Sequence, residues 1–134
     1  EFDKEILIES YVEGKELTVS IIGNKAYNPV EIIPSGEYYD FNAKYNQKDT
    51  IYKKAVLGSE RKSFLKKEAK KCFKAIGCSG WGRVDLIDDG NDFSFLEVNT
   101  VPGMTEKSLV PKSAILDKES FISILEKIIK KAVA

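Results

Sequence analysis

The sequence of 134 residues contains no histidine and only two cysteines, Cys72 and Cys78. Without histidine, Ser-His and Cys-His nucleophile pairs are excluded. The two cysteines lack the CxxC spacing of a zinc site. Cys72 falls on the apolar face of a predicted helix, and Cys78 comes just before a predicted strand. We therefore expect two small buried side chains in a protein of the reducing cytoplasm.

An excess of charge of either sign is also lacking, because Lys plus Arg and Asp plus Glu each total 21. This balance gives no reason to expect a nucleic-acid partner or an anionic membrane surface. No apolar run approaches the ~20 residues of a membrane-spanning helix, so no membrane association is expected. The hydrophobic content of 43% and the length favour a single globular domain.

A predicted hairpin carries the most informative pattern. Its first strand contains Arg83 and Asp85, its second contains Glu97 and Asn99, and residues 88–92 between them have turn chemistry. Residues two apart on a strand share a face. All four side chains share one face if the loop leaves an odd number of unpaired residues, which would place Arg83 opposite Glu97. A strict two-residue turn would place the two pairs on opposite faces.

Two interpretations of this polar row remain open on spacing alone. Two carboxylates and an amide oxygen are hard ligands that suit magnesium, and an arginine beside them suits phosphate. The row could instead be a set of salt bridges on a solvated face, which is the commoner role of an isolated acidic pair. Pro102 and Gly103 follow the row directly and favour a functional site.

The remaining segments predict an α+β fold, with a largely antiparallel sheet and helices packed on one face of it. Strands are expected at 6–12, 16–22 and 26–33, the last with an edge or bulge at Pro29. Residues 34–56 lack helical or strand periodicity, so they predict a lid-like loop.

Three helical segments are expected after this loop. The first runs from an N-cap at Ser59 to Gly77, and its lysine-rich outer face is expected to be solvated. A short turn at 105–109 should end before Pro111. A final helix at 121–132, capped by Asp117, should bury an apolar stripe.

Several motifs in this order resemble one family. They are ELTV at 16–19, YDFNAKY at 39–45, GWGRVD at 80–85, LEVNTVPGMT at 96–105 and SLVP at 108–111. Together with a preceding glutamate, Glu9, they resemble the C-terminal half of D-alanine–D-alanine ligase, of the ATP-grasp superfamily. The resemblance covers essentially the whole chain, 1–134, as the C-terminal part of the catalytic domain, with 34–56 as its lid.

The resemblance implies that two D-alanines are joined at the expense of ATP, through an acylphosphate, for peptidoglycan synthesis. Asp85, Glu97 and Asn99 would hold two magnesium ions, with manganese as an alternative. Arg83 and the backbone N–H of Gly103 would stabilise the tetrahedral intermediate.

The resemblance also implies substrate and nucleotide contacts. Lys44 would reach the phosphates from the lid. Tyr45, Ser108 and Leu109, together with Arg83 and Gly103, would contact D-alanine. The adenine and ribose of ATP would be held by four residues near the start of the chain, namely Glu9, Ser10, Val12 and Glu16.

The family's N-terminal domain and the small subdomain with its glycine-rich loop have no counterpart in this sequence, which begins at Glu1 without an initiator Met. We therefore expect a fragment that is inactive alone and a homodimer for the full-length enzyme. Two alternatives are an ATP-grasp ligase whose second substrate is D-serine or D-lactate, and a non-catalytic nucleotide-binding module.

Overall fold

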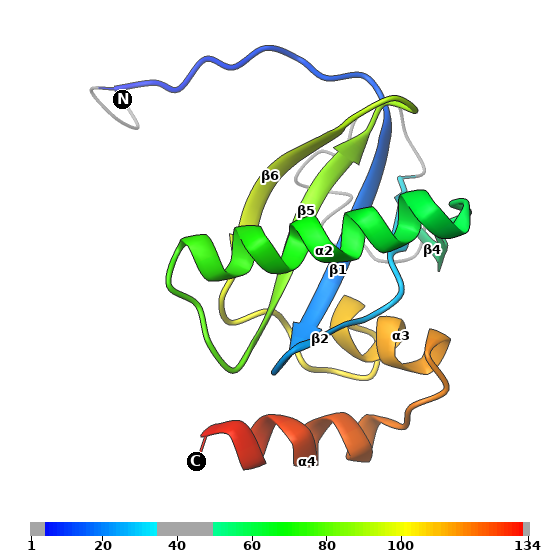
Figure 1. Cartoon of the computed structure of the whole chain (residues 1–134), viewed down its shortest axis with the longest axis vertical. Coiled ribbons are helices and arrows are strands. Elements are labelled where there is room, and N and C mark those ends of the chain that lie inside the picture. Colours follow the sequence, from blue (N-terminus) through cyan, green and yellow to red (C-terminus); the bar gives the residue numbers. More distant parts are fainter. Residues whose placement is uncertain (1–4, 35–49, 133–134) are drawn as a thin grey trace.

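The computed structural model describes residues 5–34 and 50–132, which form an antiparallel sheet with helices on both sides (Figure 1). The strand order is β4-β3-β1-β5-β6, and β2 pairs with the end of β1. The elements, in chain order, are β1 (Lys15–Ile22), β2 (Lys25–Ala26), β3 (Val30–Ile33), β4 (Ile51–Lys54), α2 (Ser59–Ala75), β5 (Trp81–Asp88), β6 (Phe93–Asn99), α3 (Leu109–Leu116) and α4 (Phe121–Ala132). The expected α+β class and the antiparallel sheet are confirmed.

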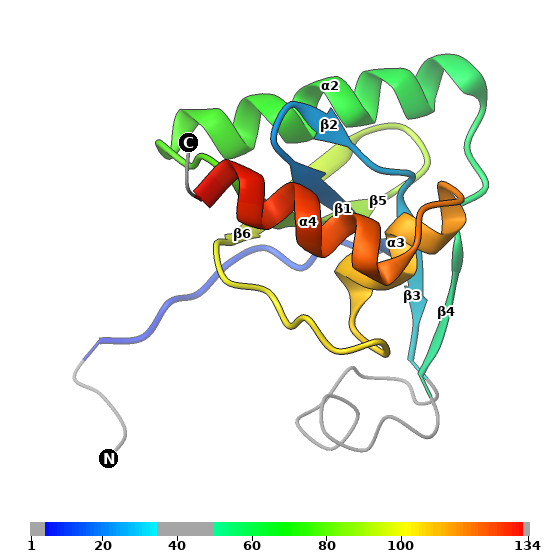
Figure 2. The same cartoon turned by 90° about the horizontal axis from the view of Figure 1, so that it is seen from below.

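Helix α2 covers one face of the sheet (Figure 2). Alternate residues of the central strand β1, such as Leu17 and Val19, point to this face and are buried against Leu65 and Phe73 of α2. Burial of a leucine or phenylalanine side chain of this kind stabilises the fold by about 1.5–3 kcal/mol. This layer is the main core, and it fixes which residues of β1 and β5 must face the other way.

Helices α3 and α4 pack at one end of the opposite face, so the helices are not confined to a single face as the sequence led us to expect. Their core joins Val110, Ala114 and Ile124 to Ile22 and Tyr27. The remainder of this face lies on the side away from α2, where the stretch between β6 and α3 runs (Figure 2). Within the described ranges, no helix is long and apolar enough to cross a membrane.

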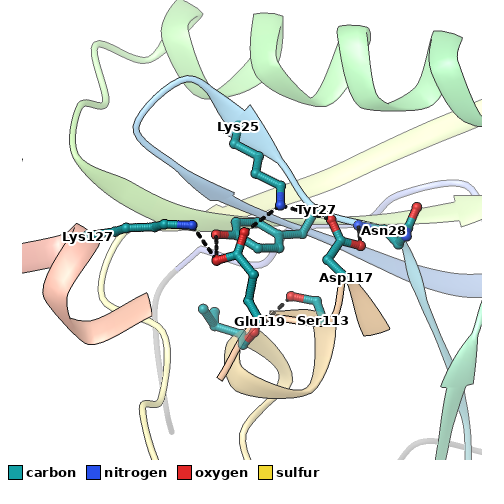
Figure 3. Close-up of polar contacts among 8 residues, drawn as sticks. Lys25, Tyr27, Asn28, Ser113, Asp117, Glu119 and Lys127 are labelled. Carbon is teal, nitrogen blue, oxygen red and sulfur yellow. Dashed lines mark hydrogen bonds and ion pairs between the residues drawn. The ribbon is translucent and has the colours of Figure 1, made fainter. Parts of the chain in front are cut away.

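An ionic clamp centred on Glu119 fastens the connection between α3 and α4 to β2 (Figure 3). One Glu119 carboxylate oxygen accepts from Lys25 Nζ at 2.6 Å, and the other accepts from Lys127 Nζ at 2.5 Å and from the Tyr27 hydroxyl at 3.1 Å. Asp117 completes the clamp by accepting from the Asn28 backbone N–H at 3.1 Å. These donors hold the pKa of Glu119 at about 2, below its ordinary value of 4.5, although its partial burial acts in the opposite direction.

Three strand predictions need correction. Residues 6–12 form no strand, and their apolar side chains Ile6, Leu7 and Ile8 are more than 80% exposed. Strand propensity alone does not stabilise a strand that lacks a paired neighbour. The segment 26–33 is divided into β2 and β3 around Pro29, and β3 lies inside the sheet because β4 pairs along its outer side. Strand β4 itself falls in the stretch where a loop was expected.

The helix boundaries also differ in detail. Gly58 rather than Ser59 is the N-cap of α2, whereas Gly77 follows the helix with a φ of 75°, as expected for that position. Helix α3 begins at Leu109 and contains Pro111 in its first turn, where a missing backbone N–H costs little. Asp117 caps the end of α3, and the Ser120 hydroxyl accepts from the Ser123 N–H at the start of α4.

The apolar stripe of α4 and the two cysteines are buried less completely than expected. The stripe centres on the fully buried Ile124, while Ile122 and Ile129 are 68% and 60% exposed. Cys72 and Cys78 are free thiols, partly buried against the core under α2.

Candidate functional site

The four polar residues of the β5–β6 hairpin do share one face, but by a different route from the one expected. Asp88 pairs with Phe93, so the turn leaves four residues, 89–92, unpaired, which is an even number. A β-bulge then places one extra residue, Leu96, on β6. Beyond the bulge, Asp85 pairs with Glu97, and Arg83 pairs with Asn99 rather than with Glu97.

The bulge reverses the direction in which the odd-numbered residues of β6 point. Before it, Phe93 and Phe95 pack against the core under α2. After it, Val98 packs against that core, and Glu97 and Asn99 lie on the opposite face with Asp85. The requirement of an odd number of unpaired residues between the paired positions is therefore met by the bulge, while the turn itself stays even.

Asp85 is the centre of the row and is only 6% exposed. Its Oδ1 accepts from Arg83 Nε at 2.8 Å and from the Thr18 hydroxyl at 2.5 Å. Its Oδ2 accepts from Arg83 Nη2 at 2.7 Å and from Asn99 Nδ2 at 2.8 Å. The two-point Arg83 contact fixes the plane of the carboxylate and holds the guanidinium along the sheet face.

Glu97 and Asn99 form the exposed end of the row. Asn99 Nδ2 donates to Glu97 Oε1 at 3.1 Å as well as to Asp85 Oδ2, so two carboxylate oxygens converge on one donor. A cation ligated by both carboxylates would take the place of this donor, and rotation of the Asn99 amide would then present its oxygen as a further ligand. In the described residues no cluster of three or more His, Cys, Asp or Glu side chains could hold a metal. A cation bound at this point would have two carboxylates and an amide as its side-chain ligands.

The loop after the row leads to the residues expected at the acceptor substrate. Ser108 is the N-cap of α3 and Leu109 is its first residue, so the N–H groups of the first turn of α3 begin here. The Ser108 hydroxyl lies against the Thr105 hydroxyl at 2.9 Å and accepts from the Thr105 N–H at 3.0 Å. A Cβ at Gly103 would come within 3.0 Å of the Ser108 hydroxyl oxygen, so the glycine allows this close approach.

Of the residues expected to contact the nucleotide, some line a common hollow in the structure and others do not. Glu16 lies on the same face as the row, because it pairs with Ile87 while Thr18, two residues further, pairs with Asp85. Glu16 and Val12 line one hollow of about 410 Å³, together with Ile87. Glu9 and Ser10 lie outside that hollow, in the exposed segment before β1. Lys44 and Tyr45 lie outside the described residues.

Thr18 is the site residue that the sequence did not reveal. It is fully buried, and its hydroxyl donates to a carboxylate 67 residues away in the chain. Its place on the row's face follows from the pairing of β1 with β5, which a single sequence does not specify. The only available signal was the polar alternation of Glu16, Thr18 and Ser20 along a predicted strand.

Solved structures of other proteins share the fold of this chain. The chain superposes on D-alanine–D-alanine ligase from Bacillus anthracis complexed with ATP with a TM-score of 0.78 and 37% identity, over 93% of this chain and 41% of that one. It also superposes on the VanG D-Ala:D-Ser ligase from Enterococcus faecalis with a TM-score of 0.73 and 29% identity, over 90% and 36%. The fold is therefore that of an α+β part of ATP-grasp ligases.

Sequence comparison names the family. The family model described as "D-ala D-ala ligase C-terminus" matches residues 1–130, so the chain belongs to this family. It is 43% identical to the D-alanine–D-alanine ligase of Actinobacillus succinogenes over 98% of its own length. It spans 44% of that enzyme, which is less than half of the relative's length.

Proposed function

We propose that this chain provides the metal-binding and transition-state face of an ATP-dependent D-alanine–D-alanine ligase that acts in the bacterial cytoplasm and supplies peptidoglycan synthesis. In the reaction, the γ-phosphoryl group of ATP passes to a carboxylate oxygen of one D-alanine. The amine of the second D-alanine attacks the acyl carbon, a C–N bond forms, and phosphate leaves as the nitrogen loses a proton. Family membership and the geometry of the row support this proposal.

The observation that carries the proposal is the convergence of Asp85 and Glu97 on one point beside Asn99. These three side chains are the proposed ligands of magnesium, which, when bound, neutralises charge on the transferring phosphoryl group. The sheet supports the ligands on two paired strands, and rigid elements hold such groups more accurately than loops do.

Arg83 is proposed to stabilise the negative charge that develops on the acyl oxygen. Its guanidinium is oriented by two hydrogen bonds to Asp85 and is only 19% exposed, so it needs little reorganisation when that charge appears. The Gly103 N–H is the proposed second donor. Ser108 and the first N–H groups of α3 are proposed to bind the carboxylate of the acceptor amino acid, where the positive end of a helix dipole favours an anion.

Glu16 is proposed to accept from the ribose hydroxyls. Glu16, which lines the hollow, lies on the face of the row, two residues along β1 from Thr18, which corresponds to ~6.6 Å. ATP laid along this face would place its ribose at the hollow and its phosphates at the row. Glu9, Ser10 and Val12 stay proposed adenine contacts, and Lys44 and Tyr45 stay proposed contacts to phosphate and D-alanine.

The acceptor needs a separate test, since a D-Ala:D-Ser ligase shares this fold. The test is a chimera in which this chain replaces the matched part of the Bacillus anthracis enzyme. Phosphate release is measured with ATP, D-alanine and each of D-alanine, D-serine and D-lactate as acceptor. We expect release that depends on magnesium and is fastest with D-alanine.

Two outcomes would contradict the proposal. Faster turnover with D-serine or D-lactate would reassign the acceptor, while an inactive but folded chimera, judged by its circular dichroism, would count against a catalytic role for these residues. Ser20→Ala in the chimera is the control for a substitution on this face of the sheet. The Ser20 hydroxyl lies on the same face of β1 as Thr18 and makes no hydrogen bond in the structure, so phosphate release should stay unchanged.

A further inference from the structure

The Thr18 hydroxyl lies beside Asp85 on the face of the sheet that carries the row. Thr18 pairs directly with Asp85 across β1 and β5, and its side chain is 0% exposed. Its hydroxyl oxygen lies 2.5 Å from Asp85 Oδ1 and 3.4 Å from the Val84 carbonyl oxygen. A hydroxyl has one proton to donate, and the much shorter contact assigns that proton to the carboxylate.

The partners of the two Asp85 oxygens differ. Arg83 donates to both oxygens, through Nε to Oδ1 and through Nη2 to Oδ2, whereas Thr18, on the side of β5 away from β6, donates to Oδ1 alone. Oδ2 is the oxygen shared with Asn99, whose amide nitrogen also reaches Glu97. Because Thr18 anchors Oδ1, the carboxylate cannot rotate without losing a buried hydrogen bond, and Oδ2 stays aimed at the exposed end of the row.

We propose that Thr18 is a positioning residue that orients Asp85 Oδ2 toward the cation shared with Glu97 and Asn99. The inference rests on the proposed function of the row and adds a residue to it. Partners that orient a metal ligand through a hydrogen bond contribute about 10–100-fold in metal affinity. Thr18 is threonine on a strand, so its χ1 is restricted and the hydroxyl direction is set by the backbone.

The test is a titration of the chain with Mn²⁺, followed by electron paramagnetic resonance in the presence of a non-hydrolysable ATP analogue. Thr18→Val keeps the shape of the side chain and removes the donor. We expect it to weaken Mn²⁺ binding about tenfold. Thr18→Ser keeps the donor and should restore affinity to within about twofold of the original, allowing for the greater χ1 freedom of serine.

Ser20→Ala is again the matched control. Ser20 lies on the same strand and face, is 0% exposed, and its hydroxyl makes no hydrogen bond, so its removal should leave Mn²⁺ affinity unchanged. Urea unfolding of each variant separates a loss of fold from a loss of orientation. If Thr18→Ser is as weak as Thr18→Val while both are folded, a packing role replaces the positioning role.

Asp85→Asn separates this inference from the proposed function. If the original chain binds Mn²⁺, Asp85→Asn loses it, and Thr18→Val binds as well as the original, only the role of Thr18 is overturned. If the original chain does not bind Mn²⁺, or Asp85→Asn binds it equally well, the metal site and the role of Thr18 are both overturned.

Discussion

Two ionic networks in this molecule, the Asp85 row and the Glu119 clamp, are built from similar groups and are arranged differently. Glu119 accepts from Lys25 of β2, from Tyr27 just after β2 and from Lys127 of α4. Asp85 takes its donors from the paired strands of one sheet, and the row ends at the exposed Glu97. The clamp therefore joins elements to one another, whereas the row presents an acidic end, which is the proposed cation site.

The largest effect is expected from Asp85→Asn in the chimeric ligase. The substitution removes one proposed ligand charge and the ion pair with Arg83, so turnover should fall by more than ~100-fold. Phosphate release measures this loss, and urea unfolding of the chain supplies the control for folding. Turnover within a few-fold of the original would show that the row, like the clamp, has only a structural role.

Glu119→Gln should have the opposite profile. Removing the charge that two ammonium groups and a phenol share should lower the free energy of unfolding by about 1–3 kcal/mol, measured by urea denaturation. Mn²⁺ affinity should not change, because the hydrogen-bond partners of Glu119 described above, Lys25, Tyr27 and Lys127, do not belong to the row. Glu126→Gln, at an exposed position of α4, is the matched control and should change stability by less than about 0.5 kcal/mol. A loss of Mn²⁺ binding in folded Glu119→Gln would show that the two networks are coupled.

The pH dependence of stability sharpens the comparison further. The pKa of Glu119 is about 2 in the folded chain and 4.5 for the ordinary group, so the unfolded chain takes up the proton first as pH falls. The contribution of Glu119 is thus complete above about pH 5 and is lost as pH falls through 4.5 toward 2. Urea unfolding at pH 7, 5, 4 and 3 should show the difference between the original chain and Glu119→Gln shrinking toward low pH. A difference that stays constant over this range would remove Glu119 ionisation as its source.

The smallest effect is expected from Tyr27→Phe. The hydroxyl donates to Glu119 at 3.1 Å, and burial together with this carboxylate raises the pKa of Tyr27. The ring stays packed in the core beside Ile124, so the loss should be limited to about 0.5–1.5 kcal/mol. Thermal unfolding, read by circular dichroism, measures it. A loss larger than that of Glu119→Gln would show that the Tyr27 hydroxyl, rather than the charge of Glu119, holds the clamp together.

The sequence was sufficient for elements whose pattern is local. Alternation along 81–88 and 93–99 predicted the hairpin, and helical spacing predicted α2 and its end at Gly77. Strand β4 was missed because Ile51–Lys54 is short and mostly exposed, and it is a strand only through its pairing with β3. Residues 6–12 show the converse case, because they have strand propensity but no paired neighbour, and they form no strand.

For the candidate site, residue type and spacing predicted the members of the row but not their pairing. The choice of Asn99 rather than Glu97 opposite Arg83 depends on the bulge, which no local pattern in the sequence announces. Thr18 was missed for a related reason, since its contact with Asp85 is a property of two strands far apart in the chain. Asp117 and Glu119 belong to a clamp in which the partners at the start of the chain, Lys25, Tyr27 and Asn28, lie about 90 residues away, beyond the reach of periodicity.

The bulge at Leu96 has a consequence for which changes in this hairpin the site can tolerate. The side chain of Leu96 is 57% exposed, so its chemical identity is weakly constrained. The presence of a residue at this position is strongly constrained. Deleting it would turn Glu97 and Asn99 toward the core under α2, although the strands could still pair. Position 96 therefore acts as a spacer of one residue, and its side chain matters little. Insertions or deletions there should damage the site far more than substitutions do.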